Sequence, residues 1–252
     1  MGTSLPRYLE MKMHQALRER CYDRIVVTGA YARTAPLEEV FQGEKTDKDF
    51  NWQRPTALLV GKELHIRCFP GNDHVVRKFN DRLVAFVGCR PSFWGDIAGE
   101  IVHYLAASKR ISEVLYFGKL GSVKKGIRPN NYLATGSSSY VSGQLVMWQN
   151  ALEPSVNLVA PEHTIFGTHI TLGSVLHETR DWLGELPASV DFVDPEIGMM
   201  AQAAVRSGIG VSYLHIISDN VAEKYHEDLS NERKKSVLVG RSSLYEVVQD
   251  VL

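Results

Sequence analysis

The sequence has few cysteines, almost no net charge and no long apolar run. Its 252 residues include three cysteines, and neither their number nor their spacing is typical of a disulfide framework or a zinc site. The 28 Lys+Arg and 29 Asp+Glu residues leave a formal charge of −1, which gives no overall basic field to attract nucleic acid. Charged residues interrupt positions 1–20, and no apolar run reaches about 18 residues, which argues against a signal peptide and a membrane span. We therefore expect a cytoplasmic protein whose partners are small molecules, without nucleic-acid or membrane partners.

Several catalytic signatures are also missing. The nine histidines form no His-Glu-x-x-His pattern, and no acidic or histidine cluster has metal-ligand periodicity, so no bound metal is expected. The Gly-x-Ser-x-Gly elbow of serine hydrolases does not occur. Segment 26–30 lacks the G-x-G-x-x-G spacing of dinucleotide-binding folds, and Tyr104 and Lys109 are five apart instead of the four needed for short-chain dehydrogenase chemistry.

Short apolar runs alternate with amphipathic stretches along the chain. The runs predict strands at 24–27, 56–60, 64–67, 83–87, 114–117, 132–135, 156–159, 190–193 and 211–217. Helical spacing of apolar residues predicts helices at 95–108 and 196–207, and a terminal amphipathic helix within 228–252. This alternation favours an α/β fold, and the lack of repeats or long linkers favours one domain over 1–252.

Four segments in this order carry a family resemblance: Gly-Ala-Tyr-Ala-Arg at 29–33, Gly-Lys-Leu-Gly at 118–121, Val-Asp-Pro-Glu at 193–196 and Ile-Ser-Asp at 217–219. Together they resemble the nucleoside phosphorylase and nucleosidase superfamily. The resemblance implies a three-layer α/β domain with a central twisted mixed sheet flanked by helices. It also implies a nucleoside substrate, phosphate as co-substrate without a further cofactor, and a homo-oligomer, either a dimer or a hexamer.

The first two segments resemble the family's phosphate-binding turns. Gly29 and Arg33 keep the ends of a G-D-P-x-R turn, where the glycine lets backbone amides approach phosphate and the arginine clamps it. Lys119 takes the place of a phosphate-binding Ser/Thr and offers a point charge. Arg90 lies in a segment that resembles a glycine-rich turn beside the anion region. The resemblance thus implies a phosphate site from these four residues.

The third segment resembles the family's sugar-binding stretch. Asp194 and Glu196 match an acidic-Met-Glu pattern, in which the glutamate accepts hydrogen bonds from the ribose 2′ and 3′ hydroxyls. A carboxylate suits that task because it offers only acceptors to two donors. Pro195 replaces the methionine that packs beneath the ribose in the family.

The remaining positions concern the base. Asp219 matches the aspartate that protonates or hydrogen-bonds N7 of a leaving purine, and a general acid contributes about 10²–10⁴-fold to such a reaction. Trp182 falls in the segment that supplies an aromatic wall for the base, and Ser137 and Ser138 fall where a strand end lines the base pocket.

The resemblance implies cleavage of the N-glycosidic bond of a purine-type nucleoside, and we expect phosphorolysis. Hydrolysis is the first alternative, because Tyr116 stands where the family has a second phosphate-binding arginine. A second alternative is that the anion site binds a phosphate of a nucleotide substrate. The third is a non-catalytic nucleoside-binding module, which the departures from the family pattern at five positions would favour: Ala30, Tyr31, Tyr116, Lys119 and Pro195.

Overall fold

The computed structural model describes residues 24–28, 65–66, 72–79, 82–89, 95–107, 111–226 and 234–251. The strands are β1 (Arg24–Thr28), β2 (His65–Ile66), β3 (Asn72–Phe79), β4 (Arg82–Cys89), β5 (Glu113–Ser122), β6 (Leu133–Thr135), β7 (Ser138–Val141), β8 (Gln144–Met147), β9 (Thr164–Phe166), β10 (Thr168–Thr171), β11 (Val190–Asp194) and β12 (Gly210–Asn220). The helices are α4 (Asp96–Ala107), α5 (Glu153–Val159), the short 3₁₀ helix η1 (Val175–His177), α6 (Arg180–Glu185), α7 (Ile197–Ser207) and α8 (Lys235–Val251).

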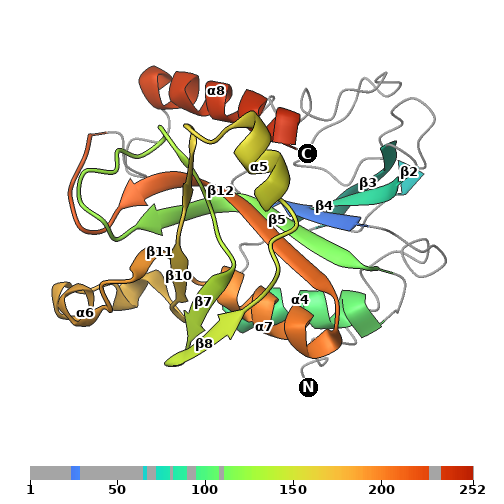
Figure 1. Ribbon diagram of the computed structural model, residues 1–252, viewed down its shortest axis with the longest axis horizontal. Coiled ribbons are helices and arrows are strands. Elements are labelled where there is room, and N and C mark those ends of the chain that lie inside the picture. The colour runs from blue at the N-terminus through green and yellow to red at the C-terminus, as the bar shows by residue number, and fades with distance from the viewer. Residues whose placement is uncertain are drawn as a thin grey trace.

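All of these strands belong to one mixed sheet whose centre is β5 (Figure 1). One edge of β5 pairs in parallel with β12 along its whole length. Its other edge is shared: the first half pairs in parallel with β1, and Gly121 and Ser122 at its end pair antiparallel with β11. The sheet therefore forks at β5, with β4, β3 and β2 continuing beyond β1, and β10, β7 and β8 continuing beyond β11.

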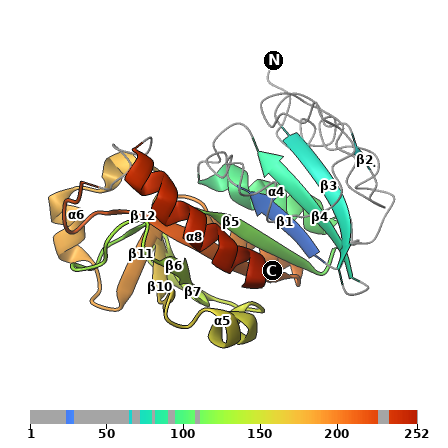
Figure 2. The ribbon, with the colours of Figure 1, turned by 90° about the horizontal axis from the view of Figure 1, so that it is seen from above.

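Helices cover both faces of the sheet. Helices α4 and α7 pack together on one face, and α8 lies on the opposite face, where it contacts β12 and α5 (Figures 1 and 2). The main core forms between the sheet and the first pair of helices, where Val102, Ala204, Val211 and Tyr213 are almost fully buried. The three-layer α/β architecture predicted from the sequence is confirmed.

Helix α7 follows from its sequence. Ile197, Met200, Ala201 and Ala204 recur at the helical interval and are buried, so one stripe of the helix faces the sheet. The helix ends at Gly208, whose φ of 68° is a left-handed conformation that glycine adopts without steric cost.

Two sequence predictions need comment. Residues 156–159 form no strand, because they lie inside α5, which begins at Glu153 with a proline in its first turn and buries only Val156 among its residues. A four-residue apolar run does not distinguish a buried strand from one turn of a helix. The strand expected at 56–60 lies outside the described residues.

The close approach of α7 to β7 and β10 gives a first testable prediction. A Cβ atom added at Gly198 would lie 2.4 Å from Thr171 Oγ1 and 2.6 Å from Ser139 Oγ. We expect Gly198→Ala to lower the free energy of unfolding by about 1–3 kcal/mol, although alanine favours helices. Denaturant unfolding measures this change.

Gly184 in α6 is the matched control, because a Cβ added there meets nothing within 4 Å. Gly184→Ala should leave the unfolding free energy unchanged or raise it by up to about 1 kcal/mol. Equal effects at the two glycines would contradict the packing described for α7.

Candidate functional site

The predicted acidic residues lie near the ends of β11 and β12, on either side of β5. Val193, just before Asp194, and Asp219 on β12 both pair with Gly121 of β5. A Cβ added at Gly121 would lie 3.0 Å from Asp219 Oδ2 and 3.3 Å from Val193 Cγ1, so the missing side chain of Gly121 lets the two strands bring these groups close. Ser218 donates a hydrogen bond to Asp219 Oδ1 at 2.9 Å. Segments 25 residues apart in sequence thus lie on the two sides of the C-terminal end of the central strand β5.

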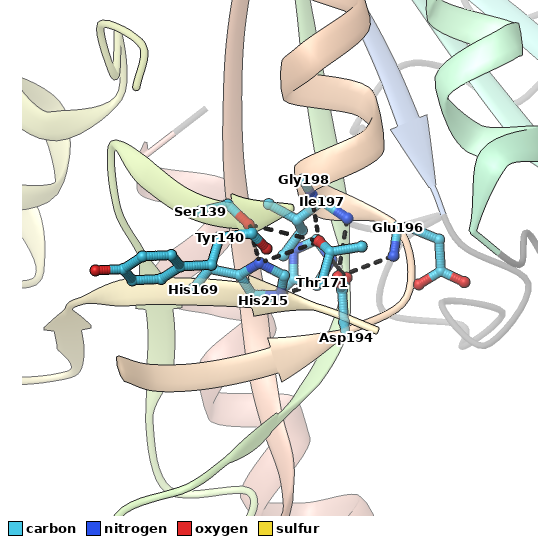
Figure 3. A network of polar contacts seen from close by, with 9 residues as sticks. All are labelled: Ser139, Tyr140, His169, Thr171, Asp194, Glu196, Ile197, Gly198 and His215. Carbon is cyan, nitrogen blue, oxygen red and sulfur yellow. Dashed lines mark hydrogen bonds and ion pairs between the residues drawn. The ribbon is translucent and has the colours of Figure 1, made fainter. Parts of the chain in front are cut away.

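Asp194 accepts several polar contacts with one of its two carboxylate oxygens. Its Oδ1 atom accepts hydrogen bonds from the backbone N–H groups of Glu196 at 2.9 Å and Ile197 at 2.8 Å (Figure 3). His169 Nε2 on β10 lies 2.9 Å from the same oxygen, although its N–H does not point straight at it. Burial raises the pKa of Asp194, but the neighbouring His169, His215 and Ile197 N–H outweigh it and hold that pKa below its ordinary value. Asp194 is therefore an ionised group that fixes the start of α7.

His169 is itself held by two hydroxyl groups. Ser139 Oγ on β7 lies 2.8 Å from His169 Nδ1, and Thr171 Oγ1 lies 3.4 Å from it. Thr171 Oγ1 also accepts a hydrogen bond from the Gly198 N–H at 2.8 Å. The polar network therefore joins β7, β10 and β11 to the first turn of α7 (Figure 3).

His215 of β12 lies on the other side of Asp194. Its Nε2 is 4.0 Å from Asp194 Oδ2, and its ring meets those of Tyr116 and Tyr213 edge-on. Burial lowers the pKa of His215 to about 4, although the charge of Asp194 opposes the shift. The ring is therefore neutral near pH 7.

Glu196 lies just before α7, and its backbone is fixed by Asp194. Its side chain extends away from the His169 ring (Figure 3) and is 8% exposed as a residue. Burial, followed by the nearby Asp194 carboxylate, raises the pKa of Glu196 to about 10. Near neutral pH this carboxyl group therefore holds a proton, so it can donate one hydrogen bond until a ligand displaces that proton.

A fourth acidic group, Glu178, lies near these strand ends, and no sequence pattern marks it. It follows η1 and is half-buried. Burial, then the nearby carboxylates of Asp219 and Asp194, together raise the pKa of Glu178 to about 7. Glu178 thus lies within electrostatic range of both aspartates, which places the ends of β11 and β12 in one acidic neighbourhood.

The predicted base-binding residues and Lys119 lie within the described part of the chain, and their positions are as follows. Trp182 in α6 packs against a small apolar cluster that includes Val193 and Val221. Ser138 Oγ lies 3.1 Å from Thr168 Oγ1, and the Ser137 carbonyl accepts a hydrogen bond from the Trp148 N–H. Lys119 lies on β5 opposite Ile216, two residues from Gly121, so it shares the face of β5 on which Gly121 meets Asp219.

The other phosphate-binding residues predicted from the sequence, Gly29, Arg33 and Arg90, lie outside the described residues. Among the residues that are described, no three acidic, histidine or cysteine side chains are arranged to hold a metal ion. No helix in the same part of the chain is long and apolar enough to cross a membrane.

Comparison with known proteins identifies the architecture. No family model matches the sequence, and neither does any curated protein. Solved structures match over almost the whole chain: a mutant methylthioadenosine/S-adenosylhomocysteine nucleosidase of Helicobacter pylori with 5′-methylthioadenosine in its active site superposes with a TM-score of 0.64 at 14% identity, covering 91% of this chain and 99% of that one. The chain has the fold of the nucleoside phosphorylases and nucleosidases.

Two further structures support this nucleosidase fold. A mutant futalosine hydrolase of H. pylori gives a TM-score of 0.63 at 14% identity, covering 91% of this chain and 98% of that chain. Uridine phosphorylase of Vibrio fischeri gives 0.63 at 10% identity, covering 97% and 98%. The fold resemblance predicted from the four sequence segments is therefore confirmed, and at these identities the likeness concerns the fold alone.

The raised pKa of Glu196 gives a prediction about stability. A carboxyl group whose pKa is higher in the folded than in the unfolded state favours folding while it holds its proton, so its contribution is full below the unfolded pKa and is lost as the pH rises toward about 10. We expect wild-type stability to fall between about pH 5 and about pH 9 more steeply than that of Glu196→Gln, by up to about 1.4 kcal/mol per pH unit for one proton.

Denaturant unfolding at several pH values measures the two slopes. Glu162→Gln is the control, because the Glu162 side chain is 67% exposed and should not change the slope. Parallel curves for wild type and Glu196→Gln would show that Glu196 titrates at its ordinary pH.

Proposed function

We propose that the protein cleaves the N-glycosidic bond of a purine-type nucleoside. The observation that carries this proposal is the placement of two acidic segments beside the end of the central strand β5. The segment that leads to Glu196 and the segment that contains Asp219 pair with opposite sides of Gly121. The chain also has a nucleosidase fold. A nucleoside has a sugar with two vicinal hydroxyl donors and a base that must gain a proton on leaving. Glu196, which directly precedes α7, and Asp219, near the end of β12, match these two demands.

Each acidic group has a role in the reaction. Glu196, once deprotonated, accepts hydrogen bonds from the ribose 2′ and 3′ hydroxyls. As the bond from C1′ to the base breaks, its electron pair leaves with the base, and Asp219 supplies or shares the proton that the base nitrogen takes up. An oxygen nucleophile then forms the new bond to C1′. The negative charge of Asp194 and its neighbours also stabilises the positive charge that develops on the sugar.

Among the described residues, water is the better supported nucleophile. Glu178 adds a third carboxyl group beside Asp194 and Asp219, and this concentration of acidic groups disfavours a free phosphate dianion. A group with a pKa of about 7 is well suited to accept the proton of an attacking water molecule. We therefore place hydrolysis first.

Phosphorolysis is the second candidate because Lys119 shares the face of β5 on which Asp219 lies. A lysine ammonium offers three donors and a positive charge to an anion. The same charge would serve a nucleotide substrate that carries its own phosphate. Release of base from inosine and adenosine with and without inorganic phosphate separates the first two reactions, and comparison with the 5′-monophosphates tests the third.

The hydrolytic assignment predicts a pH effect at Glu178. Base release should need no phosphate and should increase as the pH rises through about 7, where Glu178 becomes a base. In Glu178→Gln this increase should disappear and kcat should fall by about 10²-fold or more. The exposed Glu185 in α6 provides the control, since Glu185→Gln should keep the wild-type profile. A strict requirement for phosphate would instead establish phosphorolysis.

The assignment of Asp219 predicts a specific loss of turnover. Asp219→Asn should lower kcat by about 10²–10⁴-fold because asparagine cannot protonate the base. Nucleoside affinity should change much less, since Glu196 still binds the sugar. Asp181→Asn, an exposed change in α6, should behave as wild type. If wild type binds adenosine or inosine without base release, and Asp219→Asn binds equally well, the protein is a non-catalytic binding module.

A further inference from the structure

One oxygen atom determines how the segment that carries Glu196 is held. Asp194 Oδ1 accepts the N–H groups of Glu196 and Ile197 and also faces His169 Nε2, all within 3 Å. The Asp194 side chain thus fixes both the backbone of Glu196 and the direction in which α7 begins. Any shift of this carboxylate moves Glu196 with it.

Of the two neutral tautomers of His169, only one satisfies both of its neighbours. When the neutral ring carries its proton on Nε2, facing Asp194, Nδ1 is an acceptor, and Ser139 Oγ at 2.8 Å donates to it. The opposite tautomer would place two acceptors, Nε2 and Asp194 Oδ1, against each other. Asp194 therefore selects the tautomer with the proton on Nε2, and Ser139 holds the ring in place by donating to the remaining acceptor, Nδ1.

The whole chain of contacts is removed from water. Ser139 and His169 are 0% exposed and Asp194 is 3% exposed. A buried carboxylate that loses its partner cannot be rescued by solvent, so each link has a large effect on the next. Surface pairs of the same residues would have little influence.

From this geometry we propose that His169 and Ser139 are positioning residues, which hold Asp194 and through it place Glu196 for the ribose hydroxyls. The inference rests on the proposed function, because it takes Glu196 as the sugar ligand. Neither residue touches the sugar in this scheme. Their effect is on how Glu196 is placed and on the pH at which it loses its proton to a bound ribose.

Charged groups around Glu196 come from several elements. Asp194 lies directly beside it on β11, and His169 Nε2 on β10 lies 2.9 Å from the Asp194 carboxylate. Other titratable groups described on elements packed nearby include His215, Tyr213 and Asp219 on β12, Glu178 after η1, and the exposed Glu100 and His103 on α4. Removing the His169 donor leaves the negative charge of Asp194 less compensated. The pKa of the neighbouring Glu196 should therefore rise, so that Glu196 ionises at higher pH.

The test compares two substitutions of His169. His169→Leu keeps an apolar side chain of similar size but removes both nitrogens. His169→Gln places an amide N–H donor near the position of Nε2, so it can still reach Asp194. His163→Gln is the control, since the His163 side chain is 49% exposed and lies outside the network.

Kinetics with adenosine or inosine give the first readout. His169→Leu should raise KM by about 10- to 100-fold and shift the pH at which KM improves to higher values, with a smaller change in kcat. His169→Gln should recover most of the affinity. Ser139→Ala should cause a smaller shift in the same direction. Equal damage from Leu and Gln, or a wild-type pH profile in His169→Leu, would overturn the proposal.

Amide hydrogen exchange gives a readout that needs no substrate. Exchange at the N–H groups of Glu196 and Ile197 should be faster in His169→Leu than in wild type and near normal in His169→Gln. Unchanged exchange in His169→Leu would refute the positioning role even if nucleosides are cleaved. Wild-type protein that neither binds nor cleaves any nucleoside tested would refute the proposed function, and the exchange rates then decide whether His169 positions this segment.

Discussion

The buried carboxylate of Asp194 organises the acidic residues near the ends of β11 and β12. Placing an ionised group in the interior costs free energy, and the structure offsets this cost with two backbone N–H groups and the imidazole of His169. Those same contacts fix where α7 begins. One electrostatic requirement therefore controls a strand end, a helix start and the side chain between them, Glu196.

Crowding of acidic groups gives these strand ends their chemical character. Asp194 stays ionised because it is compensated, whereas its neighbours Glu196 and Glu178 are shifted toward the protonated form. Carboxyl groups of the same kind thus reach different protonation states through burial and mutual repulsion, which is how active sites provide an acid and a base at one pH. Gly121 leaves room for the Asp219 carboxylate beside Val193, the residue that precedes Asp194.

The sequence predicted the fold better than the site. The layered architecture and the ends of β11 and β12 followed from apolar runs and four short segments, because strand and helix periodicity is a local property. The partners of Asp194 could not be found in this way. His169 and Ser139 lie 25 and 55 positions before Asp194, and only strand register brings them to it. Glu178 follows a short 3₁₀ helix with no pattern to mark it. The apolar run at 156–159 predicts a strand but forms the last turn of α5, because a single apolar turn fits both structures.

The pairing of β5 with β12 has a consequence for how the chain acquires its structure during synthesis. The central strand is complete at residue 122, but the neighbour that covers its whole length begins only at residue 210. Until that later segment leaves the ribosome, one edge of an apolar strand has no partner within the sheet. Contacts so distant along the chain slow folding. A nascent chain that stops before β12 therefore exposes an edge of β5, a largely buried strand in the folded protein, and a chaperone that binds extended apolar segments would have a target there.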